Sequence, residues 1–112
     1  MPRCRVIQRY QTEYTDPIVV SKGEVLTLGG RDTQWAGWIW CWNAESKGGW
    51  VAERYLELGE TTGTMLRGYD ARELNVTTGE ELEILDEESG WLWCRNSAQH
   101  EGWIPADHVE RL

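Results

Sequence analysis

An internal repeat constrains the fold of this chain more than any other feature of its sequence. Residues 37–43, which read GWIWCWN, recur as residues 90–96, which read GWLWCRN. The blocks GWVA at residues 49–52 and GWIP at residues 102–105 repeat at the same spacing of 53 positions. Internal repeats at a fixed period indicate a duplicated structural unit, so the chain is interpreted as two copies of one small fold.

Upstream of these blocks the spacing between the copies grows in two steps. The block KGEVL at residues 22–26 matches TGEEL at residues 78–82, which lies 56 positions later, and Tyr10 matches Tyr69, which lies 59 positions later. The second copy is therefore shorter by three residues in each of two segments. Insertions are tolerated mainly in loops, so these two segments are predicted to be loops.

The repeated blocks have the composition of short strands. Residues 25–28 and 82–85 are mostly apolar and follow a turn-forming Gly. The polar segments 44–49 and 97–102 separate Trp-rich blocks in the manner of hairpin turns. No sustained helical period is present. Several short strands within about 50 residues predict an all-β fold of two tandem, strongly bent small barrels with little or no α-helix.

The repeat also predicts the domain boundaries. Residues 1–58 form the first barrel, residues 59–63 (GETTG) the linker and residues 64–112 the second barrel. A five-residue linker leaves little freedom, so we expect the two barrels to pack together. Domains of this size have small cores and depend on bulky aromatic side chains, which the eight Trp and four Tyr of the chain supply.

The net charge of −8 is unevenly distributed. Residues 4–58 hold six Lys/Arg and seven Asp/Glu, whereas residues 64–112 hold four and eleven. Such acidity argues against a nucleic-acid backbone as the partner and permits a basic peptide. The alternative interpretation is a solvated acidic face that maintains solubility.

The sequence gives no support for a cofactor, a metal site or an enzyme. Three Cys without a CxxC motif and two His do not make a zinc pattern, and no phosphate-binding Gly-rich loop is present. Neither His100 nor His108 has a nucleophile or an orienting carboxylate at a recognisable spacing. The lack of a long apolar run predicts a cytoplasmic protein without a membrane span.

The blocks of both copies resemble the Src-homology-3 (SH3) family, which typically reads ALYDY, a loop, ELSFxxGD, a loop, WW, a hairpin turn and GxxPxxYV. The corresponding blocks here are VIQRY and MLRGY at residues 6–10 and 65–69, WI and WL at the tryptophan pair, and GWVAERYL and GWIPADHV from residues 49 and 102. The WxWCxN signature also resembles bacterial proteins described as variant SH3-like ligand-binding proteins. The resemblance implies a non-catalytic module that binds proline-rich peptides.

The resemblance also implies a set of ligand-binding residues. The family lines its groove with aromatic side chains and one Pro, and pairs a ligand Arg or Lys with an acidic loop. The first copy keeps three aromatic residues and two acidic ones at these positions, and the second keeps two aromatic residues and the Pro. The matching residues are Tyr10, Trp38, Tyr55, Glu13 and Asp16 in the first copy and Tyr69, Trp91 and Pro105 in the second. Because the first copy keeps the larger set, it is the better candidate for peptide binding.

A stripe of Trp residues accompanies these positions. Side chains alternate along a strand, so Trp38, Trp40 and Trp42 point to one face, while Cys41 and its equivalent Cys94 point to the core. An aromatic surface of this size is usually buried by another group, which here is either a ligand, the other barrel or the loops of the same barrel.

These observations leave several functions open. The first is a peptide- or protein-binding module with an unidentified ligand. The second is a structural or assembly protein whose Trp stripe is buried between barrels or between the protomers of a homodimer. Binding of bacterial cell-wall glycan or peptidoglycan ranks below both, and a methyl-lysine cage built from the aromatic residues ranks lower still.

Overall fold

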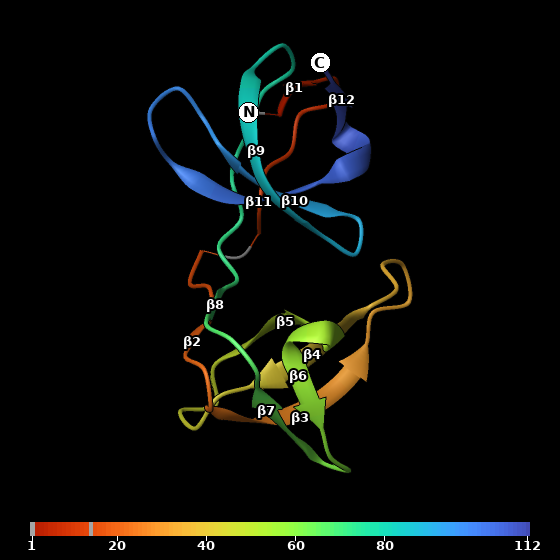
Figure 1. The fold of residues 1–112 in the computed structure, drawn as a ribbon, viewed down its shortest axis with the longest axis vertical. Coiled ribbons are helices and arrows are strands. Elements are labelled where there is room, and N and C mark those ends of the chain that lie inside the picture. Colours follow the sequence, from red (N-terminus) through yellow and green to blue (C-terminus); the bar gives the residue numbers. More distant parts are fainter. Residues whose placement is uncertain (1, 14) are drawn as a thin grey trace. The chain divides into compact units, whose positions relative to one another are not determined.

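The computed structural model describes residues 2–13 and 15–112 of the chain and divides it into two compact units. Unit 1 comprises Met1–Thr15 and Arg72–Leu112, and unit 2 comprises Asp16–Ala71. Unit 2 is thus one continuous segment that interrupts the chain of unit 1. Each unit contains one five-stranded antiparallel sheet (Figure 1). The predicted all-β class is confirmed.

In unit 1 the strand order is β11-β10-β9-β1-β12. Its first strand comes from the beginning of the chain and its other strands come from the second copy of the repeat. A short 3-10 turn, η2 (Ala106–His108), connects the last two strands. The strands are β1 (Arg3–Val6), β9 (Glu81–Glu88), β10 (Trp91–Arg95), β11 (Glu101–Pro105) and β12 (Val109–Arg111).

In unit 2 the strand order is β5-β4-β3-β7-β6, and a 3-10 turn, η1 (Glu53–Tyr55), precedes β6. A separate two-stranded pair, β2 with β8, completes the unit. Of the described residues, none belongs to a helix with the length and hydropathy needed to cross a membrane. The strands are β2 (Val19–Val20), β3 (Val25–Arg31), β4 (Trp38–Trp42), β5 (Gly48–Ala52), β6 (Leu56–Leu58), β7 (Thr62–Met65) and β8 (Tyr69–Asp70).

The two predicted hairpin turns are confirmed, and both are built around an Asn. The backbone N–H groups of Glu45 and Lys47 donate to Oδ1 of Asn43, and those of Ala98 and His100 donate to Oδ1 of Asn96. Asn side chains favour such local bonds to the backbone of a turn. The WxWCxN blocks of both copies therefore end in the same turn for the same reason.

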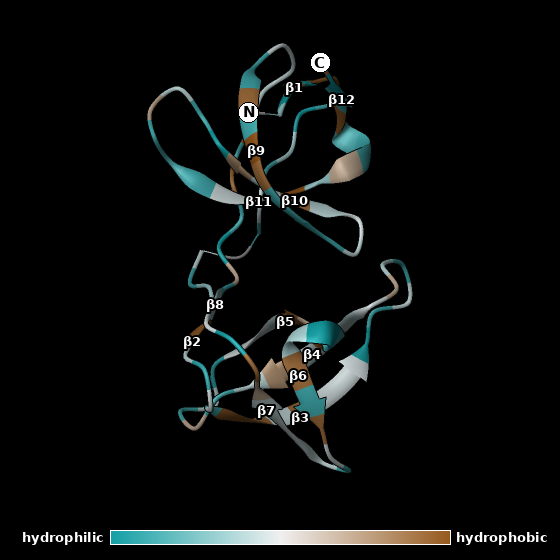
Figure 2. Ribbon diagram, viewed as in Figure 1, coloured by the Kyte–Doolittle hydropathy of each residue, from teal (hydrophilic) through white to brown (hydrophobic). Residues whose placement is uncertain are grey.

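Alternating burial along the strands places the core of unit 1. Leu82 and Ile84 of β9 are buried while their neighbours are more exposed. Figure 2 shows that hydrophobic (brown) and hydrophilic (teal) segments follow one another along β9. Leu92 and Cys94 of β10 are fully buried and belong to the same core cluster. The prediction that Cys41 and Cys94 face the cores is confirmed, since both are 0% exposed.

The first strand of each copy belongs to the unit formed by the other copy. β1 pairs with β9 and β12 of the second copy, and β7 of the second copy pairs with β3 and β6 of the first (Figure 1). The chain therefore passes between the units at residues 15–16 and 71–72. These divisions differ from the predicted domains 1–58 and 64–112, because the sequence alignment of the copies does not show which first strand closes which sheet.

The predicted linker, residues 59–63, is a hairpin turn in unit 2. The backbone N–H of Gly59 donates to the carbonyl of Thr62 at 2.8 Å, and Leu58 of β6 pairs with Gly63 of β7. A connection of three residues between adjacent antiparallel strands is typical of a hairpin. The chain therefore turns back at this point into the sheet that it has just built.

Candidate functional site

The eight predicted ligand-binding residues are distributed over the two units in a new combination. Tyr10 and Glu13 of the first copy lie in unit 1 with Trp91 and Pro105 of the second. Unit 2 holds the remaining four, which are Asp16, Trp38, Tyr55 and Tyr69. Tyr10 therefore belongs to a different unit from Trp38 and Tyr55, with which the sequence alignment grouped it.

In unit 1, Tyr10 lies at the centre of an aromatic group that we call the Tyr10 cluster, made of Tyr10, Glu73, Trp91 and His108. Its ring is perpendicular to that of Trp91, with 5.8 Å between the centroids, and to that of His108, with 5.5 Å between them. Such edge-to-face contacts are the preferred geometry of aromatic pairs. A backbone bridge between Tyr10 and Val76 fixes the segment that carries the ring.

The hydroxyl of Tyr10 donates a hydrogen bond to Oε1 of Glu73. Burial raises the pKa of Glu73 above its ordinary value of 4.5, and the hydrogen bonds from Tyr10 and Thr12 oppose that rise. A partly buried carboxylate beside aromatic rings would gain from a cationic ligand group, because the low local dielectric strengthens their attraction. The Tyr10 cluster therefore combines flat apolar surface with one negative charge.

The rest of unit 1 orients this cluster. Trp91 of β10 lies directly opposite Pro105 of β11 in the sheet register, and Pro105 is buried. The turn η2 follows Pro105 and carries His108, whose carbonyl accepts the backbone N–H of Ile7 at 2.8 Å. Three separate backbone segments thus position the ring of Tyr10 and its neighbours.

Sequence reasoning identified Tyr10, Trp91 and Pro105 individually and missed that they form one group. Glu73 and His108 are not among the predicted ligand-binding residues. No pattern in the sequence joins Tyr10 to Glu73, since they belong to different copies. The exchange of first strands brings them together.

In unit 2 the equivalent group, which we call the Tyr69 cluster, consists of Tyr55, Arg67 and Tyr69. The rings of Tyr55 and Tyr69 are tilted with 5.6 Å between their centroids, and the guanidinium carbon of Arg67 lies 4.4 Å from the centroid of Tyr55. Both Tyr residues are less than 9% exposed, and the Tyr69 hydroxyl donates to the Trp50 carbonyl at 2.8 Å. This cluster already holds a cation of its own on its aromatic face.

The two predicted acidic residues of the first copy are separated as well. Asp16 begins unit 2, where its Oδ1 lies 2.6 Å from Nζ of Lys47. Glu13 is exposed and lies in the chain segment of unit 1 that carries Tyr10. In unit 1 the partly buried Glu73 belongs to the Tyr10 cluster itself, and Oδ1 of Asp107 lies 3.7 Å from Nε2 of His108.

The Trp stripe is covered to different extents along its length. The ring of Trp40 packs edge-on against Trp50 at 5.2 Å, and the ring of Trp93 packs against Trp103 at 5.4 Å. In both pairs the partner Trp lies directly opposite on the adjacent strand, β5 or β11, so a strand side chain supplies this contact. Trp42 remains 38% exposed, while Trp38 is only 4% exposed.

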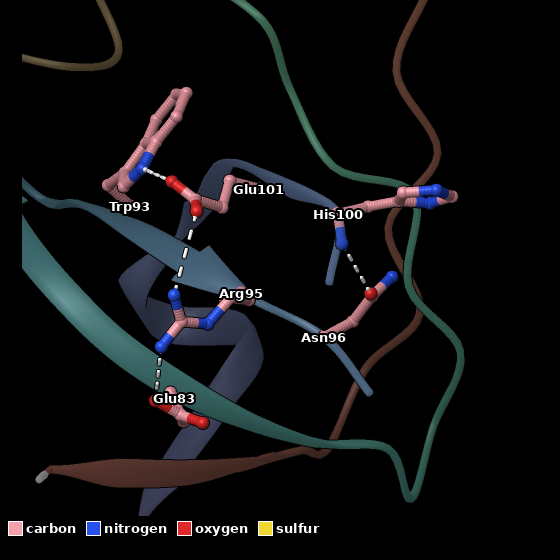
Figure 3. A network of polar contacts seen from close by, with 6 residues as sticks. All are labelled: Glu83, Trp93, Arg95, Asn96, His100 and Glu101. Atoms are coloured by element: carbon pink, nitrogen blue, oxygen red, sulfur yellow. Dashed lines mark hydrogen bonds and ion pairs between the residues drawn. The ribbon is translucent and has the colours of Figure 1, made fainter. Parts of the chain in front are cut away.

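In unit 1, Arg95 replaces the exposed Trp42 of unit 2 and supports an ionic network (Figure 3). One guanidinium nitrogen lies 2.9 Å from Oε2 of Glu83 and another lies 3.8 Å from Oε2 of Glu101. The other carboxylate oxygen of Glu101 accepts the indole N–H of Trp93 at 2.9 Å. This network fixes Trp93 at the surface of the sheet.

All three Cys are buried in the cores. Burial raises the pKa of Cys41 to about 11 and raises the pKa values of Cys4 and Cys94. The thiolate is the reactive form, so these side chains act as small apolar residues. Among the described residues, no group of three or more His, Cys, Asp or Glu is arranged to hold a metal ion.

Comparisons with known proteins identify part of the chain. Residues 65–112 match the family described as "Variant SH3 domain". The human protein "Epidermal growth factor receptor kinase substrate 8-like protein 3" is 44% identical over 41 residues, which are 37% of this chain and 7% of that protein. The chain therefore corresponds to a small part of that relative. No solved structure matches. The family match supports, in general terms, a protein-interaction module.

Proposed function

We propose that this protein is a tandem pair of SH3-like barrels that binds peptide segments of partner proteins through the Tyr10 cluster of unit 1. The observation that carries the proposal is the meeting of Tyr10, Trp91 and His108 beside the carboxylate of Glu73. Flat rings suit a polyproline II peptide, which is already ordered and loses little entropy on binding.

The charge of unit 1 supports a ligand that contains a basic residue. Unit 1 holds six Lys/Arg and eleven Asp/Glu, whereas unit 2 holds five and eight. The more negative unit is also the one with a carboxylate inside its aromatic cluster. Acidic surfaces accelerate the encounter with cationic peptides, and a close carboxylate selects among them.

The Tyr69 cluster is a weaker candidate for the same role. Arg67 lies over the ring of Tyr55, and both Tyr residues are nearly buried. A peptide that contacted these rings would have to displace a cation that already stacks on them. We therefore assign unit 2 a supporting part in the protein and unit 1 the binding surface.

The family match covers the second copy, and the register of the sheets extends the proposal to the first. Trp38 pairs with Ala52 in unit 2, and Trp91 pairs with Pro105 in unit 1. Trp91 lies 53 positions after Trp38, and Pro105 lies 53 positions after Ala52, so the two sheets have the same register here. A tandem arrangement is proposed on this ground. The expected bacterial type has no support in the comparisons, since the matching relative is a human protein.

The experiment is a titration of the whole ¹⁵N-labelled protein with proline-rich peptides that carry one Arg or one Asp at the same position. Binding to the Tyr10 cluster predicts shifts of the Trp91 indole signal and of the Tyr10 and Glu73 amide signals with the Arg peptides. The Asp peptides should bind more weakly because their charge opposes Glu73.

Two variants separate a specific site from general aromatic attraction. Trp91→Ala should abolish the shifts, whereas Trp42→Ala removes the more exposed Trp of unit 2 and should leave them unchanged. Equal losses in both variants, or shifts that concentrate on Tyr55 and Tyr69, would show that the Tyr10 cluster is not the binding surface.

A further inference from the structure

The first strands β1 and β7 occupy equivalent positions in the two sheets. β1 lies between β9 and β12, β7 lies between β3 and β6, and we call each such position a slot. In unit 1 the N–H of Val6 donates to the carbonyl of Glu80, and in unit 2 the N–H of Met65 donates to that of Glu24, both at 2.8 Å. Cys4 lies between Leu82 and Arg111, and Gly63 lies between Leu26 and Leu58, at the matching register positions. Cys4 therefore corresponds to Gly63, and Val6 to Met65.

The slot of unit 2 is tight for the side chain that β1 would bring. A Cβ atom added to Gly63 would lie 3.1 Å from Cδ2 of Leu28 and 3.2 Å from Cδ2 of Leu56. Cys4 in that position would add a sulfur atom beyond the Cβ. Inserting atoms into a packed core forces side chains or backbone to shift, which destabilises the fold.

The slot of unit 1 is shaped for larger atoms at this position. Its residues equivalent to Leu28 and Leu56 are Ile84 and Val109, and both belong to the core cluster that contains Cys4 and Val6. Gly63 here would leave the space of the Cys4 side chain empty, and Met65 would replace the smaller Val6. Each strand thus fits the core in which it lies, whereas the unexchanged pairing would crowd the core of unit 2 and leave a void in unit 1.

Charge favours the same pairing. In unit 1, Arg5 lies 3.6 Å from Glu81 and 3.4 Å from Glu110, and Arg3 lies 3.8 Å from Glu81. In unit 2 the position of Arg5 is taken by Thr64, which faces Val25 and Glu57. The basic first strand therefore lies between the acidic strands of the second copy. Exposed ion pairs add little individually, so they reinforce the choice that the cores make.

Chain connectivity adds a third reason. Only residues 59–61 separate β6 from β7, and the N–H of Gly59 closes the turn on the carbonyl of Thr62. β1 would have to close a far longer loop to reach the same edge of β6. Short loops lose less entropy on closure, so β7 reaches this slot first and more favourably.

We propose that the exchange of first strands is specified by the two slots themselves, with Gly63 and Met65 in one and Cys4 and Val6 in the other, so that the whole chain is in solution an exchanged monomer. A consequence is that each aromatic cluster takes residues from both copies. This inference does not depend on peptide binding and is tested without a ligand.

Cysteine trapping in the whole protein tests the topology. Arg5 faces Glu110 in the exchanged form, whereas in an unexchanged form it would face Glu57, as Thr64 does now. Cα atoms of facing antiparallel residues lie within the range of about 4.4–6.8 Å that a disulfide spans. Oxidised glutathione would take the two electrons and two protons released when the thiols join. The three buried native Cys have raised pKa values and should stay reduced.

The exchanged monomer predicts that Arg5→Cys/Glu110→Cys forms a disulfide within one chain and that Arg5→Cys/Glu57→Cys does not. Thr64→Cys/Glu57→Cys should also form a disulfide within one chain, and this variant is the positive control for unit 2. A disulfide within one chain in the Arg5→Cys/Glu57→Cys variant would overturn the proposal. Covalent dimers in the Arg5→Cys/Glu110→Cys variant would overturn it too, since strands would then be exchanged between chains.

A core variant tests the stated cause. Gly63→Cys/Met65→Val gives β7 the core residues of β1 and should lower the melting temperature of unit 2. The matched control, Thr64→Ser, changes the same strand on its other face and should not. Unchanged stability in the double variant would show that the cores do not select the strands.

Discussion

Units 1 and 2 share a sheet register but differ in the surroundings of one equivalent residue, which is Tyr10 in unit 1 and Tyr69 in unit 2. In unit 2 the hydroxyl of Tyr69 is bonded to a backbone carbonyl inside a nearly buried cluster that contains Arg67. In unit 1 the hydroxyl of Tyr10 is bonded to a carboxylate beside the partly exposed Trp91. The equivalent Tyr is thus packed inside unit 2, whereas in unit 1 it belongs to a partly exposed aromatic cluster that contains a carboxyl group.

The two units also differ in how the chain assembles them. Unit 2 is continuous in sequence and closes its sheet with a local hairpin, whereas unit 1 is assembled from the two ends of the chain. A local unit forms with little loop-closure entropy. The unit that depends on distant segments is the one in which we place the binding surface.

The largest expected effect concerns the glycines Gly49 and Gly102, which occupy the same place in the two units. A Cβ on Gly102 would lie 2.8 Å from backbone atoms of Glu73 and Leu74, whereas one on Gly49 would lie 2.4 Å from the Ile18 side chain. Backbone held by hydrogen bonds yields less than a side chain, so Gly102→Ala should cost about 1–3 kcal/mol and more than Gly49→Ala.

Thiol labelling in increasing denaturant measures this difference, because Cys94 reports the opening of unit 1 and Cys41 that of unit 2. Gly30→Ala is the control, since nothing lies within 4 Å of a Cβ at that position. The comparison breaks down if Gly102→Ala leaves the labelling of Cys94 unchanged.

The next effect separates the two Tyr hydroxyls. Tyr69→Phe removes the hydroxyl that donates to the carbonyl of Trp50 in a partly buried place, which should destabilise unit 2 by about 1–2 kcal/mol. Tyr10→Phe should cost unit 1 less, because the partly exposed Glu73 regains water. Denaturation followed by amide NMR signals of each unit makes the comparison. A larger loss in unit 1 would contradict it.

A smaller effect depends on pH. Burial raises the pKa of Glu73 above 4.5, so folded unit 1 holds this proton more tightly than the unfolded chain does. The stability of unit 1 should therefore fall as pH rises from the unfolded pKa through the raised folded pKa, and then level off. Glu73→Gln should remove this contribution, while Tyr10→Phe should raise the pKa of Glu73 further.

The carboxyl ¹³C signal of Glu73 and denaturation at several pH values check this prediction. Unit 2, which does not contain Glu73, serves as the internal control in the same samples. An unshifted titration of Glu73 would show that its carboxylate is better solvated than the structure indicates.

The smallest effect concerns the third position of the Trp stripe. Arg95→Ala removes the ion pairs with Glu83 and Glu101, but partly exposed pairs contribute only about 0–1 kcal/mol. Arg95→Trp gives unit 1 the residue of unit 2 and should be equally mild. Thermal melts at low and high salt measure both. A salt-insensitive loss well above this range would mean that Arg95 is important for packing.

Much of the local structure could be predicted from sequence. The GWxWCxN blocks indicated a Trp-rich strand followed by a hairpin turn, and the alternation in them placed Cys41 and Cys94 in the cores. Such features depend on residues near in sequence, whose periodicity and turn chemistry are visible directly. Gly59 shows where such prediction ends, because a Gly between the two copies is equally compatible with a linker between domains and with a hairpin turn.

The candidate site could be predicted only in parts. Tyr10, Trp91 and Pro105 were each expected to contact a ligand, but Tyr10 was grouped with Trp38 and Tyr55. Its hydrogen bond to Glu73 spans 63 positions, and no spacing rule connects residues so far apart.

The sequence by itself determined the all-β class, the two copies and the side chains that face each core, because repeats and alternation are local properties of the chain. Only the tertiary structure decided which first strand closes which sheet and therefore which residues share a cluster. The physical reason is that strand choice depends on the fit of Gly63 and Cys4 to cores that exist only after folding.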